Sequence, residues 1–239
     1  CLPLLQSNQL TQIVNTMFFE PQGWFVGSDN TAQLRNALFG LLLAVFVGMV
    51  VVGGIKRIGA FAARLVPGMV LLYGGTSLVI ILLHADQIFP SLSLILSDAF
   101  TGQAVAGGAL GMVIVTGVRR AAFSNEAGMG TEAMAHGAAK TKEPIREGVV
   151  AMWGPVIDTL IMCTLTALVL MVTDVWRSGE GDGVLLTTQA FEQALPGVGP
   201  YLLLAGVLCL SFSSMLGFSY YVVKCGCFLF GQKARLPML

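Results

Sequence analysis

The sequence has 239 residues, of which 55% are hydrophobic and 11% charged, with 13 basic and 13 acidic side chains. Soluble domains carry about 25% charged residues, so this composition excludes an ordinary soluble domain and predicts an integral membrane protein. No basic stripe with interspersed aromatic residues is present, and nucleic acid is therefore not an expected partner.

Apolar segments in chain order predict an all-α fold in a single transmembrane domain, residues 1–239. Each complete segment supplies the roughly 20 residues that a helix needs to cross about 30 Å of hydrocarbon. The chain begins at Cys1 without an initiator Met or a signal peptide pattern, so we expect a fragment of a longer protein. The predicted helices cover residues 1–19, 36–55, 65–84, 100–118, 149–173 and 201–223.

The distribution of Lys and Arg predicts the orientation in the membrane. If residues 56–64 lie inside and each later apolar segment crosses once, eleven of the thirteen basic residues lie inside. The other two, Arg35 and Arg177, lie outside. Cytoplasmic loops carry an excess of Lys and Arg. We therefore expect a plasma (inner) membrane protein with residues 119–148 and the C-terminus in the cytoplasm.

Two segments on the predicted outer side, residues 87–100 and 187–195, are amphipathic and have Pro at an edge. They are too short to span a bilayer. Such segments are typical of partial helices that lie on the membrane or dip into it.

The span at residues 100–118 contains the glycine-rich sequence AVAGGALG at residues 104–111. Gly107 and Gly111 have the spacing that allows close helix packing in membranes. The same paired glycines also fit a helix that is interrupted at mid-membrane, where secondary transporters bind their substrates. The residues alone leave both interpretations open.

Asp158 lies about ten residues from the inner end of its predicted span, roughly 15 Å deep. At i+4 spacing it shares one face with Gly154, Met162 and Thr166. An ionisable residue at this depth usually faces the bundle interior or a water path, so a substrate or ion role is one interpretation. The other is a structural Asp that pairs with a backbone donor or with a hydroxyl such as that of Thr159, Ser213 or Ser214.

Ser211, Ser213 and Ser214 form a hydroxyl cluster at mid-depth of the last span. Hydroxyl and carbonyl oxygens are hard ligands that suit an alkali cation. Membrane serines also bond back to carbonyls of their own helix or to a neighbouring helix. A sodium site and helix–helix hydrogen bonding are both consistent with this pattern.

No enzyme signature is present. His84 and His136 lie on opposite sides of the predicted membrane and cannot share a metal, and His136 is expected to be exposed in a loop or at a helix end. Nucleophile-elbow, Walker A and Rossmann motifs are absent. Cys225 and Cys227 fit small packing residues better than a metal or redox pair. We expect no enzymatic activity, no cofactor and no structural metal.

Four segments together resemble the alanine or glycine:cation symporter family. The signature segment is GVRRAAFSNEAGMGTEAMAHGAAKTKEP, at residues 117–144. The resemblance extends over nearly the whole chain, in the family's order, and also includes VVGGIKRIGAFAARLVP at 51–67, IDTLIMCTLTALVL at 157–170 and FSSMLGFSYY at 212–221.

The resemblance implies a leucine-transporter-type bundle of inverted five-helix repeats, of which this chain would supply roughly the third to eighth helices. It implies sodium-coupled symport of small neutral amino acids, alanine or glycine, by alternating access. Sodium would be the coupling ion, and the protein would lie in the lipid bilayer. The alternative is a channel or a non-transporting membrane scaffold, including a degraded, inactive copy.

The resemblance also assigns site residues. Ser213 and Ser214 would help to hold sodium. The substrate would contact one residue of the third family helix and five of the broken sixth helix: Gln6, Gly107, Gly108, Ala109, Met112 and Val113. The signature loop would belong to the inner gate, with Ser124 or Asn125 capping a short helix that has Glu126 in its first turn, and with Gly128 and Gly130 permitting tight packing or a hinge.

Two positions depart from the family pattern. Ala109 stands where many relatives have Phe, which affects the expected pocket size. Val222 and Val223 stand where relatives commonly have Gly and Glu. Loss of that carboxylate is expected to weaken the intracellular gate.

Overall fold

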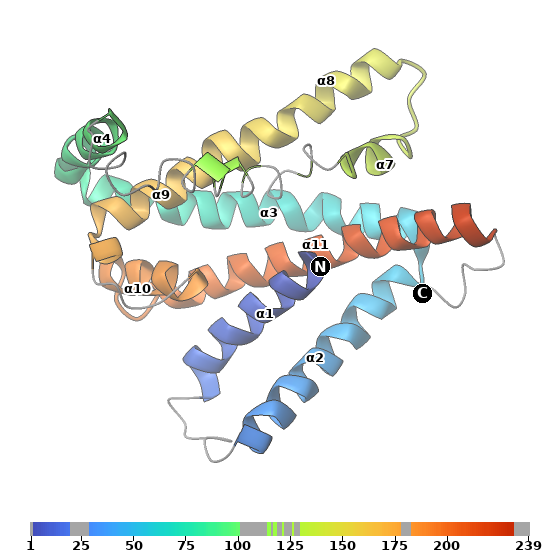
Figure 1. The fold of residues 1–239 in the computed structure, drawn as a ribbon, viewed down its shortest axis with the longest axis horizontal. Helices are drawn as coiled ribbons and strands as arrows, with labels where there is room; N and C mark the ends of the chain where they lie inside the picture. The colour runs from blue at the N-terminus through green and yellow to red at the C-terminus, as the bar shows by residue number, and fades with distance from the viewer. Residues whose placement is uncertain are drawn as a thin grey trace. The chain divides into compact units, whose positions relative to one another are not determined.

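The computed structural model describes residues 2–19, 29–100, 114–115, 117–118, 121, 126, 130–177 and 183–231. All regular secondary structure in these residues is helical (Figure 1). The chain divides into two compact units, one formed by Cys1–Thr76 with Ser178–Leu239 and the other by Ser77–Arg177. The predicted span at 100–118 lies almost wholly outside the described residues.

The first unit contains the long helices that are closest to the two ends of the chain. Figure 1 shows α1 lying beside α11, and α1 also contacts α2 and α10. The elements of this unit are α1 (Leu2–Val14), a π-helix (Asn15–Phe19), α2 (Asp29–Val51), α3 (Gly54–Leu83) up to Thr76, α10 (Val184–Ala194) and α11 (Gly199–Phe230).

The turn between α2 and α3 differs from the predicted boundaries. α2 ends at Val51, and α3 restarts at Gly54, whose φ of 70° favours glycine. Lys56 and Arg57 therefore lie on α3 rather than in a loop that closes the preceding span. The physical reason is that Lys and Arg are good helix formers, so the adjacent glycines interrupt the helix and the charges do not.

A small apolar cluster holds this turn against α11. Val50 and Val51 at the end of α2 meet Ile58 of α3 and the α11 residues Leu216 and Tyr220, all of them buried. Between membrane helices such contacts stabilise the fold through van der Waals packing, because lipid is as apolar as these side chains. The cluster therefore fixes the adjoining ends of α2 and α3 on α11.

α10 is a helix, as the amphipathic pattern of residues 187–195 predicts, and its apolar side packs inside the first unit. Ala190 and Phe191 are fully buried. The Phe191 ring stacks on Tyr73 with 5.8 Å between ring centroids. Gly206 of α11 also lies against Tyr73, whose nearest atom is 3.4 Å from the position that a Cβ would take.

The second unit contains the rest of α3, α4 (Ala85–Phe100), α7 (Glu132–His136) and one long helical run. That run consists of α8 (Pro144–Pro155), a π-helix (Val156–Met162) and α9 (Cys163–Val172), and a 3-10 turn (Val175–Arg177) follows it. α4 packs on α9. The buried residues here include Ile80, Ile81, Val169 and Val172.

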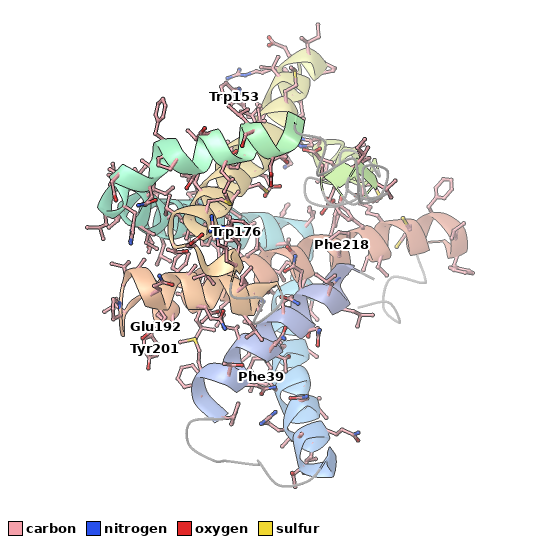
Figure 2. The ribbon with its side chains drawn as sticks, turned by 60° about the vertical axis from the view of Figure 1, so that its left-hand side comes forward. Phe39, Trp153, Trp176, Glu192, Tyr201 and Phe218 are labelled. Carbon is pink, nitrogen blue, oxygen red and sulfur yellow. The ribbon has the colours of Figure 1, made fainter. Side chains whose placement is uncertain are left out.

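Within the described part of the chain, four helical stretches are long and apolar enough to cross a membrane: Thr31–Val51, Gly54–Leu83, Pro144–Val172 and Gly199–Phe230. Their outer surfaces carry large apolar side chains, such as Leu71 and Phe228 with exposed fractions of 76% and 89%. Figure 2 shows the side chains of two further exposed residues, Trp153 on α8 and Tyr201 on α11. Contiguous apolar surface on this scale is unfavourable in water and suits contact with lipid.

Candidate functional site

A hydrogen bond connects α1 and α11, and it involves Gln6 and Ser211, two polar residues that the sequence analysis names. The Ser211 hydroxyl of α11 donates a hydrogen bond to the backbone carbonyl of Gln6 in α1, with 3.4 Å between the oxygens. Ser211 is fully buried and Gln6 is half-buried. Gln6 of α1 therefore packs against α11, the helix that carries the serine hydroxyls, although 205 residues separate Gln6 from Ser211 in sequence.

Ser213 and Ser214 are both half-buried on α11. The Ser213 hydroxyl donates to the Leu210 carbonyl of its own helix at 2.9 Å. A hydroxyl that donates its proton still has two lone pairs and can accept a cation. Ser214 follows Ser211 by three residues and shares its side of the helix, whereas Ser213 is turned by about 100° from Ser214 and by about 160° from Ser211.

Gln9 is a polar contact that the sequence analysis missed. Its side-chain Oε1 accepts a hydrogen bond from the backbone N–H of Val184 at 3.1 Å. The contact joins α1 to the first turn of α10, and Gly183 precedes that turn with a φ of 57°. The partners are 175 residues apart, so no local pattern indicates the contact.

The helical run around Asp158 is not a regular α-helix, and Gly154 departs from the predicted face. Residues Val156–Met162 form a π-helix, in which the Cys163 N–H donates to the Asp158 carbonyl five residues earlier. Gly154, before the π-helix, is exposed. Asp158, Met162 and Thr166 are all half-buried, as is Thr159.

Pro155 gives a physical reason for the change at this point. It lacks a backbone N–H, so it cannot donate to the carbonyl four residues earlier, and the regular ladder is interrupted where the π-helix begins. Single π turns inside α-helices are frequent at functional sites. Asp158 and Thr159 thus lie in an irregular part of a membrane-length helix.

Several predicted site residues lie outside the described residues. These are the substrate residues expected on the glycine-rich span (Gly107, Gly108, Ala109, Met112, Val113) and the signature residues Ser124, Asn125 and Gly128. Their assignments, and the interruption of the helix at Gly107 and Gly108, remain predictions.

The predicted helix start in the signature loop is wrong. Glu126 has a φ of 58°, which is left-handed backbone, so it does not lie in the first turn of a helix. The helix α7 begins at Glu132. Glu126 instead closes a local turn: its carboxylate accepts from the Thr131 hydroxyl at 2.8 Å, and its carbonyl accepts from the Gly130 N–H at 3.0 Å.

Gly130 has a left-handed backbone conformation that favours glycine. Its φ is 72°, in the region where a residue with a Cβ is strained. A Cβ at this position would meet no other atom within 4 Å. The backbone turn, and not close packing, is therefore the reason for glycine at this position.

His136 has two carboxylate partners, which corrects the expectation of an exposed residue. It ends α7, as a helix-end residue, but its imidazole lies 2.7 Å from Glu147 and 3.2 Å from Glu132. The hydrogen bond to Glu147 is the largest cause that raises the pKa of His136. Burial opposes this shift, and Glu132 adds to it. The arrangement stabilises the charged imidazolium.

The effect of Val222 and Val223 on the intracellular gate stays a prediction, but the structure describes their surroundings. Val222 is exposed, and Tyr220 is buried in the cluster with α2 and α3. The ammonium group of Lys224 lies 5.6 Å from the centroid of the Tyr220 ring. Lys224 thus contacts an aromatic face one turn away on the same helix.

Long apolar helices with polar residues on their inner sides define a multi-pass membrane protein. Known proteins specify the class further, because the profile of the sodium:alanine symporter family matches residues 1–239. The chain therefore belongs to the sodium:alanine symporter family.

Three curated relatives illustrate the similarity. An uncharacterized transporter of Haemophilus influenzae is 39% identical over 85% of this chain and 46% of its own length. The sodium/alanine symporter AgcS of Methanococcus maripaludis is 39% identical over 81% and 43%. The uncharacterized transporter YflA of Bacillus subtilis is 34% identical over 94% and 49%. The chain spans about half the length of the curated relatives it matches.

Proposed function

We propose that the protein is a sodium-coupled symporter of a small neutral amino acid, alanine or glycine. The observation that carries this proposal is the family match over residues 1–239. It is supported by the similarity to a relative named as a sodium/alanine symporter. The family is one of transporters, which favours transport over an enzymatic reaction.

The α1–α11 contact supports an ion and substrate site in the first unit. Gln6 and Ser211 meet there, and Ser213 and Ser214 follow within one turn of α11. We propose that the Ser213 and Ser214 hydroxyls contribute to a sodium site, since hard oxygen ligands suit an alkali cation. Gln6 would face the substrate.

The remaining substrate contacts are assigned to the glycine-rich span. In a leucine-transporter-type bundle, the helix interrupted at Gly107 and Gly108 would present a positive dipole end to the substrate carboxylate. Met112 and Val113 would contact the small side chain of the substrate. Ala109, in place of a larger residue, would widen the pocket beside it.

Asp158 and the signature loop have proposed roles in alternating access. The π-helix at Asp158 supplies a polar, half-buried position, which would face the bundle interior or a water path. The turn closed by Glu126 and Gly130 would form part of the cytoplasmic gate. In this mechanism the two sides of the site open in turn while sodium and the amino acid stay bound together.

Uptake by the full-length protein in proteoliposomes tests the proposal. Radiolabelled alanine is expected to accumulate above its external concentration under an inward sodium gradient, and unlabelled glycine is expected to compete. A proton gradient without sodium serves as the second arm. Uptake driven only by protons would overturn sodium coupling. Flux that never exceeds equilibrium would favour a channel, and absence of flux would favour a non-transporting scaffold.

A further inference from the structure

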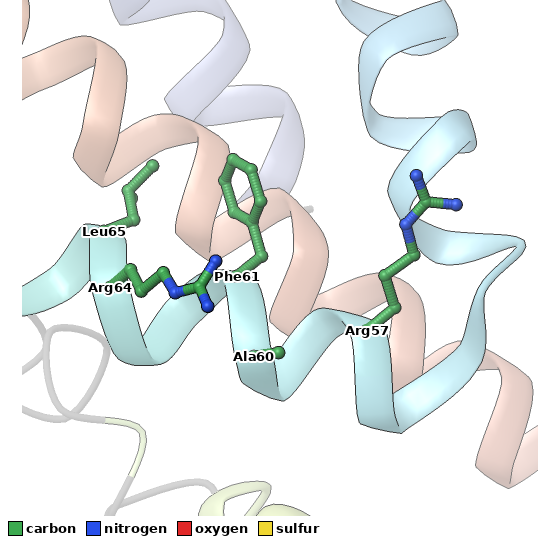
Figure 3. A pocket seen from close by; sticks show the side chains of 5 residues that line it. All are labelled: Arg57, Ala60, Phe61, Arg64 and Leu65. Carbon is green, nitrogen blue, oxygen red and sulfur yellow. The ribbon is translucent and has the colours of Figure 1, made fainter.

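A pocket of about 400 Å³ lies on α3 in the first unit. Figure 3 shows its lining side chains, with Phe61 between the two arginines. The residues recur at helical spacing and therefore share one side of α3 over about two turns. They are Arg57, Ala60, Phe61, Arg64 and Leu65.

The pocket combines an apolar floor with two positive charges. Phe61 packs against Phe212 of α11, with 5.4 Å between ring centroids, and is still 38% exposed. Arg57 and Arg64 are both exposed, and neither forms an ion pair with a carboxylate of the described residues. The pocket therefore offers two guanidinium groups beside apolar surface.

The aliphatic part of the Arg57 side chain contacts the preceding turn. It lies directly against Gly53, where a Cβ would clash with it. Packing of the stem reduces the rotamer freedom that the side chain would lose on binding a ligand. The turn between α2 and α3 thus positions this guanidinium group.

The length of α3 places both arginines near the membrane surface. α3 has 30 residues and is about 45 Å long at 1.5 Å per residue, which exceeds the roughly 30 Å of the hydrocarbon layer. Residues 65–83 are uncharged and fill that layer. The preceding part of the helix, with Arg57 and Arg64, then lies at the level of the lipid headgroups.

We infer that this side of α3 binds an anionic phospholipid, with Arg57 and Arg64 contacting the headgroup phosphate, Phe61 lying beside the headgroup between them and Leu65 contacting the acyl chains. Guanidinium groups match phosphate geometry through paired N–H donors. Basic pockets beside membrane helices are suited to anionic headgroups. A zwitterionic lipid carries an added positive charge that such a pair of arginines disfavours. This inference is independent of the transported substrate.

Native mass spectrometry of the full-length protein tests the inference, with phosphatidylglycerol and phosphatidylcholine as probes. The wild-type protein is expected to retain phosphatidylglycerol preferentially. Arg57→Gln with Arg64→Gln is expected to weaken that retention by about 30-fold, the loss expected for two basic groups at a membrane surface. Arg57→Lys with Arg64→Lys keeps both charges but loses the paired N–H donors, so its retention of phosphatidylglycerol is expected to lie between those of the wild type and the glutamine variant.

A matched double variant separates this site from general electrostatics. Lys140→Gln with Arg146→Gln removes two exposed charges from the loop predicted on the same side of the membrane. This variant is expected to bind phosphatidylglycerol as the wild type does. Equal loss in both double variants, equal retention of the two lipids, or unchanged retention in the Arg57 and Arg64 variant would overturn the inference. Full displacement by inorganic phosphate would also overturn it, because the site would then bind free phosphate.

Discussion

The Nδ1 atom of His136 lies 2.7 Å from a carboxylate oxygen of Glu147, which ties the last residue of α7 to the first turn of α8. The other ring nitrogen lies 3.2 Å from Glu132. These contacts raise the pKa of His136 above its ordinary value of 6.5, with Glu147 as the largest cause. The charged imidazolium therefore holds the two helices together.

The first prediction tests whether Glu147 is the main cause of the raised pKa of His136. In Glu147→Gln, the pKa of His136 should fall towards its ordinary value, because the strongest partner of the imidazolium loses its charge. A histidine-selective NMR titration of the full-length protein measures the change, with His84→Gln used to assign the resonances. A pKa that is unchanged in Glu147→Gln would contradict the role of this pair.

The second prediction follows from the sign of the shift. A His with a higher pKa in the folded protein contributes stability that is fully present below its unfolded value of about 6.5 and is lost as pH rises through the folded value. From about pH 6 to about pH 9, the unfolding midpoint of the wild type should fall by about 1–2 °C more than that of His136→Gln. Parallel pH profiles of the two proteins would contradict this prediction.

The third prediction tests the proposed sodium site. Ser213→Ala with Ser214→Ala should raise the sodium concentration needed for half-maximal alanine uptake by about tenfold or more, since two hard oxygen ligands are removed. Ser219→Ala is the matched control, because Ser219 donates to the Met215 carbonyl of the same helix at 2.8 Å and is not assigned to the site. An unchanged sodium dependence in the double variant would remove these hydroxyls from the ion site.

The fourth prediction concerns the packing of α10 on α11. A Cβ on Gly199 would collide with the Phe191 carbonyl, so Gly199→Ala should destabilise the protein by about 1–3 kcal/mol. Gly217 lies on the same helix with open space around its Cβ position. Gly217→Ala should be neutral or slightly stabilising because Ala favours the helix. The midpoints of thermal unfolding of both variants measure these changes. Equal midpoints would contradict the prediction, because the contact of Gly199 with Phe191 would then not restrict the residue at position 199.

The sequence predicts where long helices lie better than where they begin and end. The apolar runs at residues 36–55 and 201–223 fall largely within α2 and α11, because period and composition are local properties. Lys56 was expected to close a span, but the helix breaks at the glycines before it. Charge indicates membrane depth, and backbone freedom decides where a helix ends.

Contacts between distant residues explain most of what sequence reasoning missed at the candidate site. Gln6 and Ser211 were both singled out, but nothing local indicates that they meet across 205 residues. The pair of His136 and Glu147 depends on the turn between α7 and α8. Gly154 was placed on the face of Asp158 by an α-helical period that the π-helix after Pro155 does not keep.

The π-helix Val156–Met162 acts as a one-residue insertion in an otherwise α-helical span. Because one residue corresponds to about 100° of an α-helix, the side chains before and after the segment are out of phase by about that angle. Deletion of a single residue here would restore an α-helix and rotate α8 about its axis relative to α9. The segment that contains Asp158 therefore determines which side chains of α8 and α9 share a face. Relatives that align here without a gap would keep the same rotation between the two helices.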